Sequence, residues 1–197
     1  MKKYEFTGET KRVELWDRTA TLHRIKATVE FGFVKVGELG GWIEKEENLS
    51  HEGKAWVYGD AKVYGDAEVY GDAEVCGDAK VCGNAKVCGD AKVYGNAKVY
   101  GNAKVCGDAE AFLTSHVLVI GPVGSRNNFT TFFRDKDNEI TVRCGCFLGK
   151  IDRFLEKVTQ THGNNKYALV YRTAVEVAKL QIGLTESENI KSGKEWI

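Results

Sequence analysis

The sequence contains almost no proline or methionine, with one residue of each among 197. It also lacks any run of the roughly 18 to 20 apolar residues that a membrane-spanning helix needs. The first residues, 1–5, lack the apolar core of a secretory signal peptide. We therefore expect a cytoplasmic protein with no part in a membrane.

Net charge is absent as well, because 28 acidic and 28 basic residues cancel. A chain without excess positive charge produces no long-range field that would attract nucleic acids or an anionic membrane. The sequence thus carries no strong nucleic-acid signal, and recognition of a partner is expected to depend on local patches. The hydrophobic content of 43% is ordinary for a folded protein.

Residues 55–110 repeat every six positions without interruption. Valine recurs from Val57 to Val105, and alanine recurs at the same interval from Ala55 to Ala109. A period of six would spread the valines over several faces of a helix, whereas valine favours strands and glycine before Asp or Asn favours a turn. Each hexapeptide is therefore predicted to be a short strand and a corner, with Val and Ala inward and the other side chains outward.

The pattern Val-x-Gly-(Asp/Asn)-Ala-x resembles the hexapeptide repeat of left-handed parallel β-helices. The resemblance implies a triangular coil of about 18 residues, with coils stacked at the strand spacing of about 4.8 Å. Leu49, Val117 and Ile120 extend the pattern imperfectly, which places the β-helix at residues 49–121 and gives it about four coils. Such a stack needs a cap at each end.

The segments on either side are expected to supply these caps. Residues 1–48 alternate as strands do and are predicted to form a β N-terminal cap. Residues 122–197 are predicted to form a small α+β module in which a hairpin, 129–134 with 140–144, precedes two helices. Asn165 is the expected N-cap of the second helix, and glycines are expected to end both helices, Gly163 and Gly183. The predicted fold is mainly β: a left-handed parallel β-helix with a β N-terminal cap and a C-terminal ββαα module.

Both flanking segments resemble those of short hexapeptide-repeat proteins encoded by phages and prophages of gut bacteria. The resemblance covers residues 24–50 and most of 124–182. The segments that carry it are Val-Gly-Glu-Leu-Gly-Gly-Trp-Ile-Glu at 36–44, Cys-Gly-Cys-Phe at 144–147 and Thr-His-Gly-Asn at 161–164. It implies a mobile-element origin and brings no established chemistry.

Many left-handed β-helix proteins are acyltransferases, in which a histidine at the coil surface deprotonates the acceptor and a neighbouring coil holds acyl-coenzyme A. Residues 55–110 contain no histidine, no proline and no inserted loop, and His51 and His116 stand only at the margins. A general base must reach its substrate, and the regular coils offer no imidazole. The sequence therefore predicts no catalytic residue and no cofactor. An acyltransferase that uses acyl-coenzyme A is the alternative hypothesis.

Four of the six cysteines replace tyrosine at the outward position after valine: Cys76, Cys82, Cys88 and Cys106. Cys88 and Cys106 are 18 residues apart and should be vertical neighbours, near enough for a disulfide. The expected reducing compartment nevertheless predicts four free, outward-facing thiols. The tyrosines at this position form either a recognition stripe or stacked ladders that shield the backbone.

Cys144 and Cys146 lack the paired spacing of a zinc site and are predicted to lie in a core strand, so no metal is expected.

Residues that are 18 positions apart lie on the same face of the predicted coils, and one of the three faces is acidic. It carries a single lysine, Lys92, and five acids that give it a net charge of −4: Asp72, Glu74, Asp90, Asp108 and Glu110. This face is either plainly solvated or a contact for a basic protein surface.

A second candidate site lies in two loops of the C-terminal module. Arg126 and Asn128 precede the hairpin, and His162 and Asn164 lie between the helices. If the loops lie close together, these side chains form a polar pocket for an anion or a nucleotide-like ligand.

These features predict a non-enzymatic binding or scaffold protein. The solenoid is expected to be a rigid spacer, and the terminal modules to supply recognition or self-association into a homo-oligomer. The most concrete function is inhibition of a host defence system, by binding a host protein or by sequestering a nucleotide signal. It follows from the association with mobile elements rather than from a physical argument.

Overall fold

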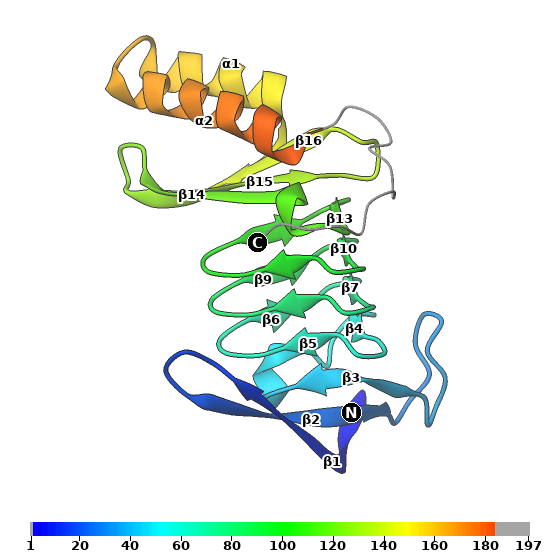
Figure 1. Ribbon diagram of the computed structural model, residues 1–197. Helices are drawn as coiled ribbons and strands as arrows, with labels where there is room; N and C mark the ends of the chain where they lie inside the picture. Colours follow the sequence, from blue (N-terminus) through cyan, green and yellow to red (C-terminus); the bar gives the residue numbers. More distant parts are fainter. Residues whose placement is uncertain (1, 184–197) are drawn as a thin grey trace, which may run out of the picture.

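A computed structural model describes residues 2–183 and shows an elongated stack of three parts (Figure 1). An N-terminal antiparallel sheet leads into a parallel β-solenoid, and a second antiparallel sheet covered by two helices stands at the other end. The mainly β fold predicted from the sequence is confirmed. Within the described residues, no helix has the length and apolar character needed to span a membrane.

The solenoid consists of short parallel strands in three columns. Their bounds are β4 (Trp56–Val57), β5 (Lys62–Val63), β6 (Glu68–Val69), β7 (Glu74–Val75), β8 (Lys80–Val81), β9 (Lys86–Cys88), β10 (Lys92–Val93), β11 (Lys98–Val99), β12 (Lys104–Cys106) and β13 (Glu110–Ala111). The columns are β5-β8-β11, β4-β7-β10-β13 and β6-β9-β12. Paired residues are 18 positions apart, as in Val63↔Val81 and Val81↔Val99. The predicted coil of 18 residues and the total of about four turns are thus confirmed.

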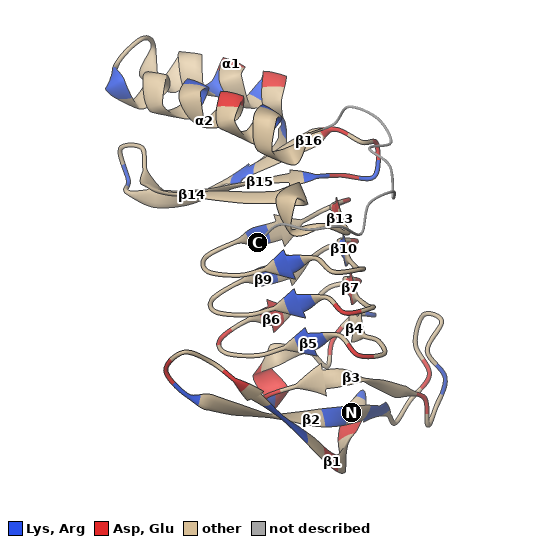
Figure 2. Cartoon of the chain, in the orientation of Figure 1, with Lys and Arg blue, Asp and Glu red and all other residues tan. Residues whose placement is uncertain are grey.

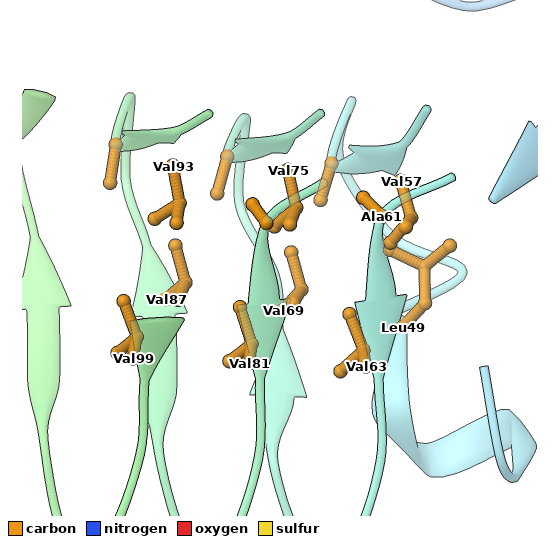
Figure 3. Packing of buried hydrophobic residues seen from close by; sticks show 14 of the residues in the cluster. Leu49, Val57, Ala61, Val63, Val69, Val75, Val81, Val87, Val93 and Val99 are labelled. Atoms are coloured by element: carbon orange, nitrogen blue, oxygen red, sulfur yellow. The ribbon is translucent and has the colours of Figure 1, made fainter. Parts of the chain in front are cut away.

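The valine and alanine columns form the interior of the solenoid. Every repeat valine and alanine is at most 1% exposed. Figure 3 shows Val63, Val81 and Val99 side by side in one row along the stack, with Val69 and Val87 in a second row that faces them. Each buried valine contributes roughly 1.5 to 3 kcal/mol to folding. Alternation along the strand therefore sends the valine of every hexapeptide into one continuous core.

Glycine is required at the corners for two reasons, and Gly83 shows both. Its φ of +69° lies in the left-handed region that side chains with a Cβ rarely adopt. A Cβ at this position would also lie 3.1 Å from the backbone nitrogen of Gly101 in the next coil. The corners therefore stack as closely as the strands do.

The N-terminal cap contains β1 (Tyr4–Glu14), β2 (Thr19–Ala27), β3 (Leu39–Ile43) and the 3-10 helix η1 (Glu46–Asn48). Strands β1, β2 and β3 are antiparallel neighbours, and β3 then pairs in parallel with β5. At the edge of the first coil, Asn48 is fully buried, and its Nδ2 donates to the carbonyls of Gly65 (3.0 Å) and Ala67 (2.8 Å). Lys3 Nζ donates to the carbonyl of Ala55 (2.8 Å). These side chains satisfy carbonyls that an open sheet edge would expose.

The C-terminal module contains β14 (Val117–Val123), β15 (Asn128–Arg134), β16 (Ile140–Cys144), β17 (Phe147–Lys150), α1 (Ile151–His162) and α2 (Lys166–Ile182). The predicted hairpin β15–β16 and both helices are confirmed, and β14 and β17 complete an antiparallel sheet. The sequence analysis placed Val117 and Ile120 in the solenoid, but they belong to β14. A 3-10 turn, η2 (Thr114–His116), interrupts the coil after β13, and alternation suits either kind of strand.

The C-terminal sheet is one layer between the solenoid and the helices. Phe133 packs into the solenoid core, whereas Phe132 packs into the cluster under α1 and α2, because neighbouring strand residues face opposite sides. Thr131 Oγ1 accepts a hydrogen bond from the backbone nitrogen of Lys104 (3.0 Å), which caps the last coil. Asn165 is the N-cap of α2 as predicted, since its Oδ1 accepts from the amides of Tyr167 (2.9 Å) and Ala168 (3.2 Å).

The prediction that all four repeat cysteines are free is wrong for two of them. Cys88 on β9 and Cys106 on β12 form a disulfide across neighbouring coils, with their Cα atoms 4.6 Å apart. Stacking alone places residues 18 apart at this distance, so the geometry favours the bond whatever the compartment. Cys76 and Cys82 are free and half-buried. The predicted core strand ends at the half-buried Cys144, and Cys146 lies exposed in the turn after it.

Candidate partner-binding groove

The five acidic residues of the predicted face all line one groove on the outside of the solenoid. The groove has a volume of about 450 Å³, and it also contains Tyr58, part of the β2–β3 loop and three lysines: Phe31, Gly32, Phe33, Val34, Lys54, Lys92 and Lys136. Acidic segments follow the edge of the solenoid beside β4, β7 and β10 in Figure 2. The groove therefore runs along the coils, from the N-terminal cap to the turn after β15.

The acids form two ladders along the groove. Asp72, Asp90 and Asp108 occupy the same corner position in successive coils, at intervals of one strand spacing, about 4.8 Å. In the second ladder, Lys92 on β10 pairs in register with Glu74 on β7 and with Glu110 on β13. The coil geometry thus repeats negative charge at a fixed interval over three turns.

Basic residues from outside the repeat neutralise part of this charge. Lys54 Nζ lies 3.2 Å from Asp72, Lys136 Nζ lies 2.8 Å from Asp108, and an Arg134 nitrogen lies 3.9 Å from Glu110. Five acids and three lysines line the groove, which gives it a net charge of −2 rather than the −4 of the face alone. Among residues 2–183, Glu74 and Asp90 have no lysine or arginine within ion-pair distance. These two carboxylates are the most available to a partner.

The groove also has an aromatic rim, which the sequence pattern did not indicate. Phe33, in the β2–β3 loop, is 92% exposed. Phe31 beside it is half-buried against Trp56, with ring centroids 5.3 Å apart, and lies under the Lys3 ammonium at 4.9 Å. Large exposed aromatic side chains are enriched in protein-binding surfaces. The segment Phe31-Gly-Phe33 is a visible sequence signal, but only the fold places it beside the acids.

Burial and ion pairs shift the pKa values of three groove residues. Burial, followed by the charges of Glu74 and Glu38, raises the pKa of Tyr58 to about 12. The backbone N–H and the ammonium of Lys54 lower the pKa of Asp72. The hydrogen bond to Asp108 raises the pKa of Lys136. The shifts at Asp72 and Lys136 therefore reflect the ion pairs that these residues already form.

The second candidate site comprises residues of the β14–β15 and α1–α2 connections, and both connections lie toward the same end of the C-terminal module (Figure 1). The ring of His162 stacks on Tyr171 at a centroid distance of 5.9 Å, and a Cβ at Gly124 would lie 2.0 Å from the Tyr171 hydroxyl. Tyr171 thus connects the two loops. Asn164 Oδ1 accepts from Arg172 (3.1 Å) and so supports the α1–α2 connection. Arg126 and Asn128 lie at the β14–β15 connection, and neither lines the solenoid groove or the two cavities beside α1 and α2.

Two histidines at the margins of the solenoid are part of its caps. His116 is 6% exposed and lies edge-on to Phe112, with ring centroids 4.1 Å apart. Burial, assisted by Arg134, lowers the pKa of His116 to about 4. His51 Nδ1 accepts a hydrogen bond from the Lys3 amide (3.1 Å), and its ring stacks on Tyr4 at 4.3 Å. Both imidazoles are held by packing.

No protein-family model matches the chain, and no curated protein is significantly similar to it. Among residues 2–183, no cluster of three or more His, Cys, Asp or Glu side chains is arranged to hold a metal ion. The groove is therefore the best-defined candidate site, and its function must be inferred from its shape and charge.

Proposed function

We propose that the protein is a non-enzymatic binding protein whose solenoid groove holds a basic segment of another protein. The proposal rests on one observation: the five acids and the exposed Phe33 line the same groove. Neither feature would indicate a site alone, since exposed acids are often only solvated. Together they offer a negative floor and an apolar contact.

Glu74 and Asp90 are the proposed centre of recognition. A lysine or arginine of the partner placed here would meet two carboxylates that lack an ion pair within residues 2–183. Three lysines would repel cations at other positions in the groove: Lys54 and Lys136 near its ends, and Lys92, which is in register with Glu74. Charge of alternating sign sets the register and rate of association more than the affinity.

Histidine placement supports binding over the alternative, acyl transfer. The base of an acyltransferase must be exposed to its acceptor and able to take a proton near neutral pH. His116 is buried with a pKa of about 4, and His51 contacts Tyr4 and Lys3 in the N-terminal cap. Calorimetric titration with acetyl-coenzyme A tests this alternative. Saturable micromolar binding would favour the enzyme.

The experiment for the groove compares variants of equal charge change. Glu74→Gln with Asp90→Asn removes the two unpaired carboxylates, whereas Glu68→Gln with Asp78→Asn removes two acids from the other faces. A fluorescent octa-arginine peptide is the probe, followed by polarisation at low and at physiological salt. The groove variant should bind at least about tenfold more weakly than the control variant. Equal weakening would show that only net charge matters.

Phe33 provides the second arm of this experiment. Phe33→Ala should weaken octa-arginine binding less than the groove variant does, because arginine stacks on an aromatic ring but is attracted more strongly by the carboxylates. It should weaken capture of a natural partner that has apolar side chains. We also propose that the partner belongs to a host defence system, as an origin in a mobile element would imply. Capture from host lysate with the wild type, but not with the groove variant, would support this setting.

A further inference from the structure

Helix α2 has a second apolar stripe on the side that faces away from the sheet. The residues that pack inward are Ala168, Tyr171, Ala174, Val175, Ala178 and Ile182. On the opposite side, four apolar side chains are exposed to 65%, 40%, 43% and 86%: Leu169, Val170, Val177 and Leu180. The helices form the outermost layer of the molecule in Figure 1, so no other described element covers this side. We call these four residues, with Thr173 between them, the outer stripe.

The spacing of the outer stripe is that of a helix-pairing seam. Val170, Thr173, Val177 and Leu180 follow intervals of three and four residues, which place them on one line along the helix. A solvated helix normally has polar residues on its outer side. By contrast, α1 exposes mainly polar residues outward: Asp152, Glu156, Thr159 and Gln160. The pattern on α2 is thus specific to this helix.

We infer that the outer stripe joins two copies of this chain through an antiparallel α2–α2 contact. The stripe is complementary to itself in this orientation. When Leu169 lies against the partner's Leu180, the two large side chains meet at both ends of the contact, and the smaller Thr173 and Val177 lie near the two-fold axis. In a parallel pairing, each residue would lie against the same residue of the partner. Arg172 and Glu176 would then each face a like charge.

Charge favours the same alignment. With Leu169 against the partner's Leu180, Glu176 lies against the partner's Thr173 and one residue from the partner's Arg172. Because a two-fold axis keeps residues on the same lateral side, both Glu176–Arg172 pairs form together. Arg172 already donates to Asn164, Gly163 and Thr159, and Glu176 already pairs with Lys179 (2.9 Å). Each keeps a hydrogen-bonding site for the new pair, since a guanidinium has five N–H donors and a carboxylate accepts at two oxygens. One alignment therefore satisfies both the apolar and the charged residues.

The exposed apolar area approaches what a dimer interface requires. From their fractional exposures, the four apolar side chains present roughly 400 Å² per copy, about the size of the largest apolar patch on a typical monomer. A stable interface buries roughly 800 Å² per partner, of which somewhat more than half is apolar. A shallow cavity of about 370 Å³ beside the stripe, lined by Leu155, Arg172, Thr173 and Glu176, offers space for a side chain of the partner.

Sedimentation equilibrium of the full chain tests the contact. Over about 1 to 100 μM, the mass should rise from 21.8 kDa toward twice that value. Leu180→Glu should raise the dimer dissociation constant at least about tenfold, whereas Leu113→Glu, at a leucine 47% exposed elsewhere, should not change it. Glu176→Arg should weaken the dimer, and combining it with Arg172→Glu should restore it. A monomer at every concentration would overturn the inference.

Cross-linking tests the orientation. In a Cys146→Ser background, a mixture of Leu169→Cys and Leu180→Cys chains should form a disulfide between unlike chains on mild oxidation, and Leu180→Cys alone should not. The reverse result would overturn the antiparallel contact. If a chain cut after Gly183 dimerises and the full chain does not, residues 184–197 rather than a second copy occupy the stripe. Failure of the groove variant to lose peptide binding would leave this inference untouched, because α2 does not line the groove.

Discussion

Asn48 is expected to be the most sensitive polar residue of the N-terminal cap. Its side chain is fully buried and makes four hydrogen bonds with backbone groups. Oδ1 accepts from the amides of Glu44 (3.1 Å) and Lys45 (2.9 Å), and Nδ2 donates to two carbonyls of the first coil. A hydrogen bond contributes about 0.5 to 1.5 kcal/mol, and a buried group left without a partner costs about 1 to 3 kcal/mol. Asn48→Ala should therefore lower the free energy of unfolding by roughly 3 to 5 kcal/mol.

Asn48→Asp separates the two halves of this argument. The aspartate keeps the acceptor but places a carboxylate oxygen against the carbonyls of Gly65 and Ala67, which raises its pKa in the folded state above the ordinary value. The variant is therefore most stable below about pH 4, the pKa of an aspartate in the unfolded chain. Its free energy of unfolding falls as the pH rises through the pKa of this aspartate in the folded state. The variant should be closer to wild type at pH 4 than at pH 7.

Urea denaturation at both pH values, followed by circular dichroism, measures the effect. Asn96→Asp is the matched control, because Asn96 is exposed at a repeat corner where other coils carry Asp, and it should change stability by less than about 0.5 kcal/mol. Equal, small losses for Asn48→Asp and Asn96→Asp at pH 7 would refute the assigned role of Asn48 as the cap of the first coil.

Three further predictions concern the solenoid and its C-terminal end. Val81→Asp should cost several kcal/mol and lower the melting temperature far more than Lys80→Asp, because Val81 is fully buried between Val63 and Val99, whereas Lys80 lies at the surface. Equal thermal shifts would contradict the period-six core. The lowered pKa of His116 means that stability should fall as the pH drops from about 6.5 to about 4, since the unfolded chain takes up the proton first; His116→Gln should flatten this part of the urea-midpoint curve. Reduction of the Cys88–Cys106 disulfide, which closes 18 residues, should cost up to about 3 kcal/mol, while Cys76→Ser should cost little; an unchanged melting temperature in dithiothreitol would show that the bond does not contribute.

Local pattern alone was enough for the solenoid and for the helix ends. The period of six fixes which side chains alternate inward, and glycine at each corner is required by its positive φ, so both can be read from neighbouring residues. The same holds for Asn165 as an N-cap, because the cap bonds amides only two and three residues away. The left-handed coil stays a prediction from the resemblance of the repeat.

The groove could be predicted only in part. The five acids of the groove were predicted by grouping residues that are 18 positions apart, because such residues become neighbours when the coils stack in parallel. Phe33 and Lys136 come from the two caps, and their approach to the acids depends on how β3 and β15 join the stack. No local sequence pattern encodes how close Phe33 and Lys136 come to the acids. The net charge of −2 and the aromatic rim of the groove were therefore not predicted.

The sequence by itself thus determined what each coil must be, because a repeat carries the same local interactions six residues at a time. Only the tertiary structure decided what the ends of the stack do. Long-range contacts moved Val117 into an antiparallel sheet and buried Asn48 against the first coil. Such contacts depend on which chain segments meet after folding, and their partners lie between 16 and 19 residues away in sequence.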